Sequence, residues 1–199
     1  MKVLMTGSSG LVGTALTEAL AREGHTVVRL VRSGSGKKGN GKPANKEAEN
    51  QKKLAQARDR AANTTEVAWN PNTCDLEGEP FGAEQPKVEG ADAVVNLAGA
   101  SIAGQSWSEE RKALLRSSRV QFTRELLCVL EKLSARPKTL VSASAIGYYG
   151  NRGDAVLTEE SRPGEEFLAR LAQEWEAEAV KAEALGMRVV RTRFGIILA

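Results

Sequence analysis

Three glycines near the start of the chain have the spacing of a turn that holds a phosphate. They are Gly7, Gly10 and Gly13, in the segment TGSSGLVG. Such a turn needs residues that can adopt positive φ, and a pyrophosphate can approach the backbone only where no Cβ intervenes. A helix that starts at the turn then offers unpaired N–H groups and the positive end of its dipole. The spacing predicts a pyrophosphate-binding turn, and a glycine-rich turn without a ligand is the alternative.

The neighbouring residues predict the strand and the helix that such a turn requires. Residues 2–6 and 26–31 are short apolar runs, and residues 10–23 carry apolar side chains at helical spacing. A strand, a glycine turn, a helix and a second strand within about 30 residues form a βαβ unit, which implies a parallel sheet. In this context the glycine spacing is typical of a dinucleotide site.

Further strands and helices continue the pattern to the end of the chain. Strands are predicted at 66–69, 91–99, 139–145 and 187–198, and helices at 108–133 and 165–185. Ser108 is a good N-cap for the first of these helices. We therefore expect an α/β fold with a doubly wound, Rossmann-like parallel sheet, in one domain that spans residues 1–199.

Residues 33–64 interrupt this domain with a basic insertion. The first part is rich in Gly, Lys and Asn, and the second part, 46–63, favours a helix but has Leu54 as its single large apolar residue. A segment that cannot bury an apolar face is expected to be a solvated helix or disordered. It holds eight Lys/Arg and three Asp/Glu of a chain whose formal charge is +3, so the rest is slightly acidic. We therefore expect no nucleic-acid partner.

The bulk composition excludes several other classes of protein. Hydrophobic residues make up 41% and charged residues 27%, as in soluble globular proteins, and no apolar run approaches the roughly 18 residues of a membrane span. Cys74 and Cys128 form no C-x-x-C pair, and His25 is the single histidine. We expect neither a metal site nor a disulfide framework, and a reducing compartment such as the cytoplasm.

The segment GKKGNGKP, residues 36–43, is a near match to the phosphate loop of nucleoside triphosphatases. In that loop a Ser or Thr hydroxyl follows the lysine and binds magnesium, and here Pro43 takes its place. Proline neither supplies a hydroxyl nor continues that backbone comfortably. We expect no triphosphatase activity.

Several motifs together resemble the extended or atypical short-chain dehydrogenase/reductase superfamily. Beyond TGxxGxxG they are VVNLAGASIAG, WSEERK, SSRV, SASAIGYYGNRGD and LTEES, and they resemble more narrowly its epimerase-like 39U family. The resemblance covers the chain except 33–64 and implies bound NADP(H). It places these residues at the cofactor: Gly7, Ser9, Gly10, Leu11, Val12, Gly13, Leu97, Ala98, Gly99 and Arg119. A helix-surface arginine is the alternative for Arg119.

The resemblance also bears on the extent of the protein. Members of the family continue into a smaller substrate-covering lobe that this chain lacks, so the expected fold has no C-terminal substrate lobe and the small-molecule substrate stays open. The helices at 108–133 and 165–185 correspond to those that pair in dimers of the superfamily, which makes a homodimer possible. Members in photosynthetic eukaryotes are plastid proteins, which is the alternative compartment.

Arg32 indicates which dinucleotide is bound. A site for NAD usually has an acidic residue about 20 residues after the glycine turn, where it accepts a hydrogen bond from the ribose 2′-hydroxyl. Here Arg32 stands 19 residues after Gly13, and no Asp or Glu occurs from Val27 until Glu47. A guanidinium can bind a 2′-phosphate in bidentate fashion. We expect NADP(H), with a solvated strand end as the alternative role of Arg32.

The chemistry of the superfamily uses a Tyr-x-x-x-Lys pair with a Ser or Thr. By the resemblance, Leu168 and Ala172 occupy the Tyr and Lys positions, so the dyad is missing. Ser144 and Tyr149 are the candidate catalytic residues, and closing the strand end is their alternative role. Two functions stay open: an oxidoreductase or epimerase acting on a small carbonyl or alcohol, and a non-catalytic, redox-responsive cofactor-binding protein.

Overall fold

The computed structural model describes residues 1–32, 63–70, 74–76, 85–103 and 106–197. Its centre is a seven-stranded sheet in the order β4-β3-β2-β1-β5-β6-β7. Every neighbouring pair in this sheet is parallel except β3 and β4. The strands are β1 Lys2–Thr6, β2 Thr26–Arg32, β3 Thr64–Asn70, β4 Asp75–Leu76, β5 Ala93–Asn96, β6 Thr139–Ala145 and β7 Arg188–Phe194.

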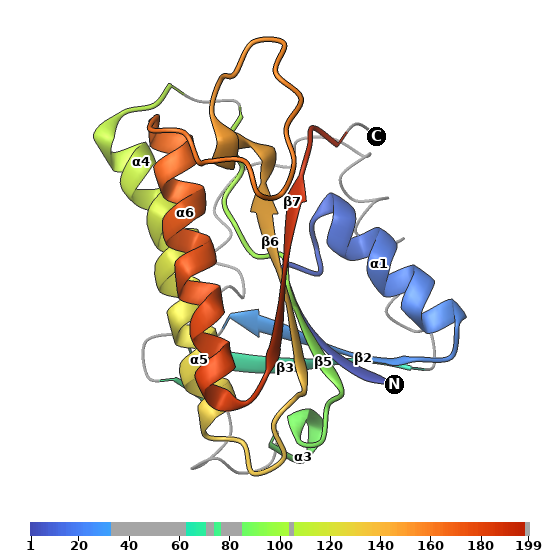
Figure 1. Ribbon diagram of the computed structural model, residues 1–199. Helices are drawn as coiled ribbons and strands as arrows, with labels where there is room; N and C mark the ends of the chain where they lie inside the picture. Colours follow the sequence, from blue (N-terminus) through green and yellow to red (C-terminus); the bar gives the residue numbers. More distant parts are fainter. Residues whose placement is uncertain (33–62, 71–73, 77–84, 104–105, 198–199) are drawn as a thin grey trace, which may run out of the picture.

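Helices cover both faces of the sheet (Figure 1). On one face lies α1 Leu11–Arg22, and on the other lie α4 Glu109–Arg116, α5 Phe122–Glu131 and α6 Phe167–Val180. Shorter elements complete the described chain: α3 Gln85–Val88, the π-helical η1 Ser117–Gln121, and the 3₁₀ turns η2 Ile146–Tyr149 and η3 Lys181–Leu185.

The alternation of side chains along β1 divides the core between the two faces. Val3 and Met5 pack with Leu16 and Leu20 of α1, whereas Leu4 belongs to the cluster that contains the apolar side chains of α5. Successive residues of a strand point to opposite faces, so an uninterrupted apolar run is what a strand buried on both sides requires. The core therefore positions α1 and α5 on opposite sides of the same carboxyl edge.

The predicted fold class is confirmed, since this is a doubly wound α/β sheet of the Rossmann kind. Along the chain the sheet grows outward from β1 in one direction through β2 and β3 and then in the other through β5, β6 and β7. The order reverses between β1 and β5. In open α/β sheets the ligand lies at this switch point, beyond the carboxyl ends of the strands.

Element boundaries differ from the predicted ones in instructive places. The helix predicted over 108–133 contains the π-helical η1, so it is not one regular α-helix. Its predicted N-cap is confirmed, because Ser108 Oγ accepts from the N–H of Arg111 at 3.3 Å. β3 begins at Thr64, the last residue of the predicted insertion, and residues 33–62 lie outside the described residues.

Within the described ranges, every helix is too short or too polar to cross a bilayer. The two helical segments expected at a dimer interface are α4–α5 and α6, which lie side by side on one face of the sheet (Figure 1). A salt bridge of 3.2 Å between Arg124 Nε and Glu178 Oε1 joins them. The homodimer stays a prediction.

Candidate functional site

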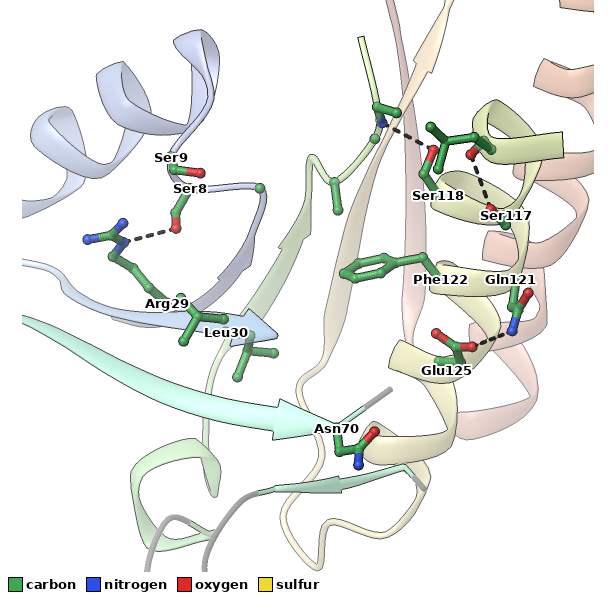
Figure 2. A pocket seen from close by; sticks show the side chains of 16 residues that line it. Ser8, Ser9, Arg29, Leu30, Asn70, Ser117, Ser118, Gln121, Phe122 and Glu125 are labelled. Atoms are coloured by element: carbon green, nitrogen blue, oxygen red, sulfur yellow. Dashed lines mark hydrogen bonds between the residues drawn. The ribbon is translucent and has the colours of Figure 1, made fainter. Parts of the chain in front are cut away.

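A cavity of about 760 Å³ opens at the switch point of the sheet. In Figure 2 the glycine turn and β2 form one wall, and η1 and α5 face them across the opening. The lining residues come from six parts of the chain: Gly7–Ser9, Arg29–Val31, Asn70, Ala98–Ala100, Leu114 of α4, and Ser117, Ser118, Gln121, Phe122 and Glu125 of η1 and α5.

The three glycines of the turn serve different purposes. Gly7 has φ +68°, and a Cβ there would lie 2.5 Å from the carbonyl carbon of Leu97. A Cβ on Gly13 would overlap the carbonyl oxygen of Gly7. At Gly10 the nearest atom would be 3.4 Å away, which is ordinary contact. Gly7 and Gly13 are therefore required for packing, whereas a Cβ at Gly10 would be accommodated at the start of α1.

The first turn of α1 presents backbone donors beside this space. The first N–H groups of an α-helix have no partner within the helix, and here they belong to Leu11, Val12 and Gly13. Gly10 precedes the helix and has no side chain to cap them. Ser9 is exposed and lines the cavity next to Ser8. Of the predicted cofactor-binding residues of the turn, Gly7 and Ser9 line the cavity, and Gly10, Leu11, Val12 and Gly13 follow them at the start of α1.

Arg29 is a cavity residue that the sequence prediction missed. Its Nε donates to Ser8 Oγ at 2.9 Å, and its Nη1 lies 3.1 Å from Glu66 Oε1 of β3. Figure 2 shows the side chain extending from β2 toward the glycine turn. One signal in the sequence could have found it: Arg29 is a charged residue inside the apolar run of β2. A charged side chain among buried residues needs a partner.

Arg32, the predicted cofactor-selecting residue, ends β2. Its backbone pairs with Trp69 of β3, while its side chain lies outside the described residues. Its role stays a prediction.

The segment after β5 forms the floor of the cavity, and of its predicted cofactor residues Leu97 is not among those that line it. Ala98 and Gly99 line it, and Leu97 packs against Gly7 and into the core on both faces. Just before them, Thr6 Oγ1 donates to Asn96 Oδ1 at 2.7 Å. Because Thr6 is the last residue of β1, this bond holds the two strands at the switch point together.

Arg119 supports this floor from behind. Its Nη2 donates to the carbonyl oxygen of Ala100 at 2.9 Å, and its guanidinium lies so close to Gly99 that a Cβ there would be 3.2 Å from Cζ. The guanidinium carbon is also 5.3 Å from the ring centre of Trp175. Burial, and then the charge of Arg111, lower the pKa of Arg119. Arg119 is thus neither a free surface residue nor among the residues that line the cavity.

The opposite end of the cavity is polar, with an apolar patch beside it. Gln121 Nε2 donates to Glu125 Oε1 at 2.8 Å on the helical wall, and Asn70 ends β3 nearby (Figure 2). Leu30 and Phe122 supply the apolar surface. No signal in the sequence distinguished Gln121 and Glu125 from an ordinary polar helix surface. They meet Asn70 only because the fold packs α5 beside the end of β3.

The two catalytic candidates are joined by one ion pair, whose carboxylate is buried and whose guanidinium is partly buried. Ser144 Oγ donates to Glu176 Oε1 at 2.6 Å, and Arg193 grips the same carboxylate through Nε at 2.8 Å and Nη2 at 2.9 Å. Arg193 Nη1 then donates to the hydroxyl of Tyr149 at 2.7 Å. The exposed fractions of Ser144, Tyr149 and Glu176 are 3%, 7% and 4%. Both hydroxyls are therefore bonded within the protein, that of Ser144 as a donor and that of Tyr149 as an acceptor.

Charge compensation keeps this network ionised. Burial raises the pKa of Glu176, but hydrogen bonds from Arg193 and Ser144 outweigh it and bring the pKa below its ordinary value. The hydrogen bond to Glu176 raises the pKa of Arg193 in turn. A buried carboxylate held by a bidentate guanidinium is a strong, specific contact. We call these four residues, Ser144, Tyr149, Glu176 and Arg193, the Glu176 network.

The positions expected for the missing Tyr-x-x-x-Lys pair lie on α6. Ala172 is buried and Leu168 is partly buried in an apolar cluster with Leu171 and Trp175. Neither side chain can donate or accept a proton, so the structure offers no substitute at these two positions.

Comparisons with known proteins agree with the resemblance read from the motifs. A family model described as the NAD dependent epimerase/dehydratase family matches residues 3–197. An epimerase family protein of Mycobacterium bovis is 37% identical over 98% of this chain and 54% of its own length. The chloroplastic SDR39U1 homolog of Arabidopsis thaliana is 32% identical over 100% of this chain and 49% of its own length.

A solved structure shows the same fold. The human epimerase family protein SDR39U1, in complex with NADPH, superposes with a TM-score of 0.67 at 24% identity, over 100% of this chain and 55% of that one. The chain thus spans about half the length of the curated relatives it matches. Family model and relatives confirm the 39U resemblance, and the chain belongs to the NAD dependent epimerase/dehydratase family.

Proposed function

We propose that this chain binds NADP(H) in the cavity between the glycine turn and α5. The observation that carries the proposal is the different surroundings of the three glycines in the turn: Gly7 and Gly13 have no room for a Cβ, whereas a Cβ at Gly10 would meet no atom closer than 3.4 Å. The N–H groups at the start of α1 are the donors that would hold a pyrophosphate, assisted by the helix dipole.

The rest of the cavity fits a dinucleotide. Its volume of about 760 Å³ falls within the range of small-molecule and cofactor sites. Leu30 and Phe122 offer apolar surface for a ring, with Asn70 and Glu125 as polar neighbours. The NADPH in the human relative and the NAD in the family's description support a nicotinamide dinucleotide.

A preference for NADP(H) over NAD(H) follows from the charge on the β2 wall. The guanidinium of Arg29 lines the cavity beside Ser8, and Arg32 follows at the end of the strand. A 2′-phosphate would gain from this positive charge, and a ribose 2′-hydroxyl would gain little. Glu66 bonds to Arg29 from the neighbouring strand, so it fixes the guanidinium and also offsets part of its charge.

The first candidate function is an oxidoreductase or epimerase acting on a small carbonyl or alcohol, and the family's description as NAD dependent epimerase/dehydratase supports its cofactor and its epimerase part. A bound nicotinamide would supply hydride transfer. For the proton, the chain offers Ser144 and Tyr149, whose hydroxyls are bonded to Glu176 and Arg193. In this arrangement Ser144 donates to the protein itself.

The second candidate function is a non-catalytic, redox-responsive cofactor-binding protein. It is favoured by the Glu176 network together with the apolar residues Leu168 and Ala172. With these groups engaged or apolar, cofactor binding would proceed without a partner for proton transfer.

Calorimetric titration of the full chain with NADPH and with NADH tests the binding proposal. NADPH should bind at least about 10-fold more tightly, since a hydrogen bond to a charged group contributes about 1.5–3 kcal/mol. Equal affinities, or no binding of either, would contradict it. Consumption of NADPH across a library of carbonyl compounds then separates the two candidate functions.

A further inference from the structure

The two cysteines of the chain, far apart in the sequence, meet beside the cavity. Cys74 occupies the turn between β3 and β4, with φ +57°, and Cys128 lies on α5. The β3–β4 pairing, Asn70 with Asp75, forms the hairpin that carries Cys74. The sequence contains no other cysteine, so one intramolecular disulfide is possible.

Several contacts hold the hairpin against this helix. Lys132, one turn after Cys128, donates from Nζ to the carbonyl oxygen of Cys74 at 3.2 Å. The rings of Trp69 and Phe122 meet edge to face, with centres 5.2 Å apart. The Cys128 side chain lies within hydrogen-bonding reach of the Cys74 thiol. Both cysteines are partly exposed.

We infer that Cys74 and Cys128 form an oxidisable dithiol, a modification site for low-molecular-weight disulfides that closes into a disulfide between the β3–β4 hairpin and α5. One cysteine releases its proton to solvent, attacks a sulfur of glutathione disulfide as the thiolate and expels one glutathione thiolate, which leaves a mixed disulfide. The second cysteine gives its proton to that thiolate and attacks the first cysteine's sulfur, expelling the second glutathione as a thiolate that takes up the proton released first. Two protein thiols are oxidised and one external disulfide is reduced.

The surroundings assign the order of these steps. Burial, and then the hydrogen bond with Cys128, raise the pKa of the Cys74 thiol to about 11, against the smaller effect of the Lys132 charge. A thiol that keeps its proton is a poor nucleophile. This favours Cys128 for the first attack and Cys74 for the closing attack.

The site borders the cavity on both walls. Asn70 lies four residues before Cys74 on β3, and Glu125 lies one helical turn before Cys128 on α5, and both line the cavity. The disulfide would tie the two walls together at that end. Its formation requires no bound cofactor, so the test does not depend on the proposed function.

The test is a redox titration of the full chain in mixtures of reduced and oxidised glutathione, in native buffer and in urea. Intact mass and peptide mapping should show loss of two hydrogen atoms and a Cys74–Cys128 cross-link, reversed by dithiothreitol. Because the fold holds the thiols together, the oxidation equilibrium constant should be at least about 10-fold larger in native buffer than in urea. A ratio of one or below, a stable glutathione adduct, or disulfide-linked dimers would overturn the inference.

Single variants test the order of attack. Cys74→Ser and Cys128→Ser should each take up one glutathione and form no internal cross-link. Cys74→Ser, which keeps the attacking sulfur, should react faster. The reverse order would overturn the assignment of Cys128 as the attacking residue.

Discussion

Ser144, at the carboxyl end of β6, and Glu176, in the middle of α6, are joined by a buried hydrogen bond of 2.6 Å between Oγ and Oε1. The hydroxyl that resembles a substrate-facing group therefore points to a helix of its own domain. Since Arg193 of β7 grips the same carboxylate, the bond fastens α6 to two neighbouring strands. The Glu176 network therefore has a structural role. Any catalytic use of the Ser144 hydroxyl would have to break its hydrogen bond to Glu176.

Replacing Glu176 by Gln should destabilise the fold strongly. The change leaves the guanidinium of Arg193, whose side chain is 14% exposed, beside a neutral amide. Removing one partner of a buried ion pair costs roughly 3–5 kcal/mol. Glu174→Gln is the matched control on the same helix, because Glu174 is 41% exposed and pairs with the exposed Arg116. That change should cost less than about 1 kcal/mol. Urea denaturation measures both, and similar losses in the two variants would contradict the structural role.

The stability of the chain should fall in acid. The pKa values of Glu176 and Glu178 are both lowered from 4.5: burial raises each, and hydrogen bonds, from Arg193 and Ser144 or from Arg124 and Lys181, outweigh it. A carboxyl whose pKa is lower in the folded state binds fewer protons there, so its stabilisation is complete above the unfolded pKa and is lost as pH falls through the folded pKa. The melting temperature should drop below about pH 4.5. A smaller drop is expected in Glu176→Gln, and an equal drop in that variant would count against the network.

The sequence predicts well the elements whose signals are local. The apolar runs at 2–6 and 139–145 become β1 and β6 at those boundaries, and the cap at Ser108 is where the first-turn pattern places it. The glycine turn is predicted for the same reason, because the glycines that its backbone conformation requires lie close together in the sequence.

What the sequence does not predict depends on pairing across the fold. Arg29 meets Ser8 over 21 residues, and Glu176 meets Ser144 over 32 and Arg193 over 17. No local pattern selects these partners, since the strand order sets which side chains face one another. The π-helical η1 is likewise not predicted, because the apolar spacing in the sequence continues through it as in a regular α-helix.

Gly10→Ala and Gly13→Ala should separate binding from folding. Ala at Gly10 fits the extended backbone, with φ −76° and ψ 172°, and its Cβ would meet no atom closer than 3.4 Å, so the melting temperature should change little. That methyl group would occupy the space proposed for the pyrophosphate and should weaken NADPH binding at least about 10-fold. Ala at Gly13 would overlap the Gly7 carbonyl oxygen and should lower the melting temperature. Unchanged NADPH affinity in Gly10→Ala would contradict the site.

Arg29→Met should reduce the preference for NADPH. The change removes the positive charge from the cavity wall and keeps an unbranched side chain of similar reach, so NADPH should bind about 10-fold more weakly while NADH binding stays nearly constant. Arg22→Met, at the exposed end of α1, is the control and should leave both affinities unchanged. Arg32→Ala measures the contribution predicted from the sequence. Loss of NADH and NADPH affinity in equal proportion would show that Arg29 supports the fold of the site without selecting the phosphate.

The last prediction concerns turnover. Leu168 and Ala172 offer no proton at the expected positions, and the hydroxyls of Ser144 and Tyr149 are bonded to Glu176 and Arg193. General acid–base catalysis typically contributes about 10²–10⁴-fold to rate, so its absence should leave negligible NADPH-dependent reduction of simple carbonyls even when the cofactor is bound. Steady-state absorbance of NADPH measures this in the full chain. Ser144→Ala and Tyr149→Phe should then leave the low rate unchanged, as should the neighbouring control Tyr148→Phe. Robust turnover that disappears in Ser144→Ala or Tyr149→Phe, and persists in Tyr148→Phe, would show that the Glu176 network opens during the reaction and would identify the residue that transfers the proton.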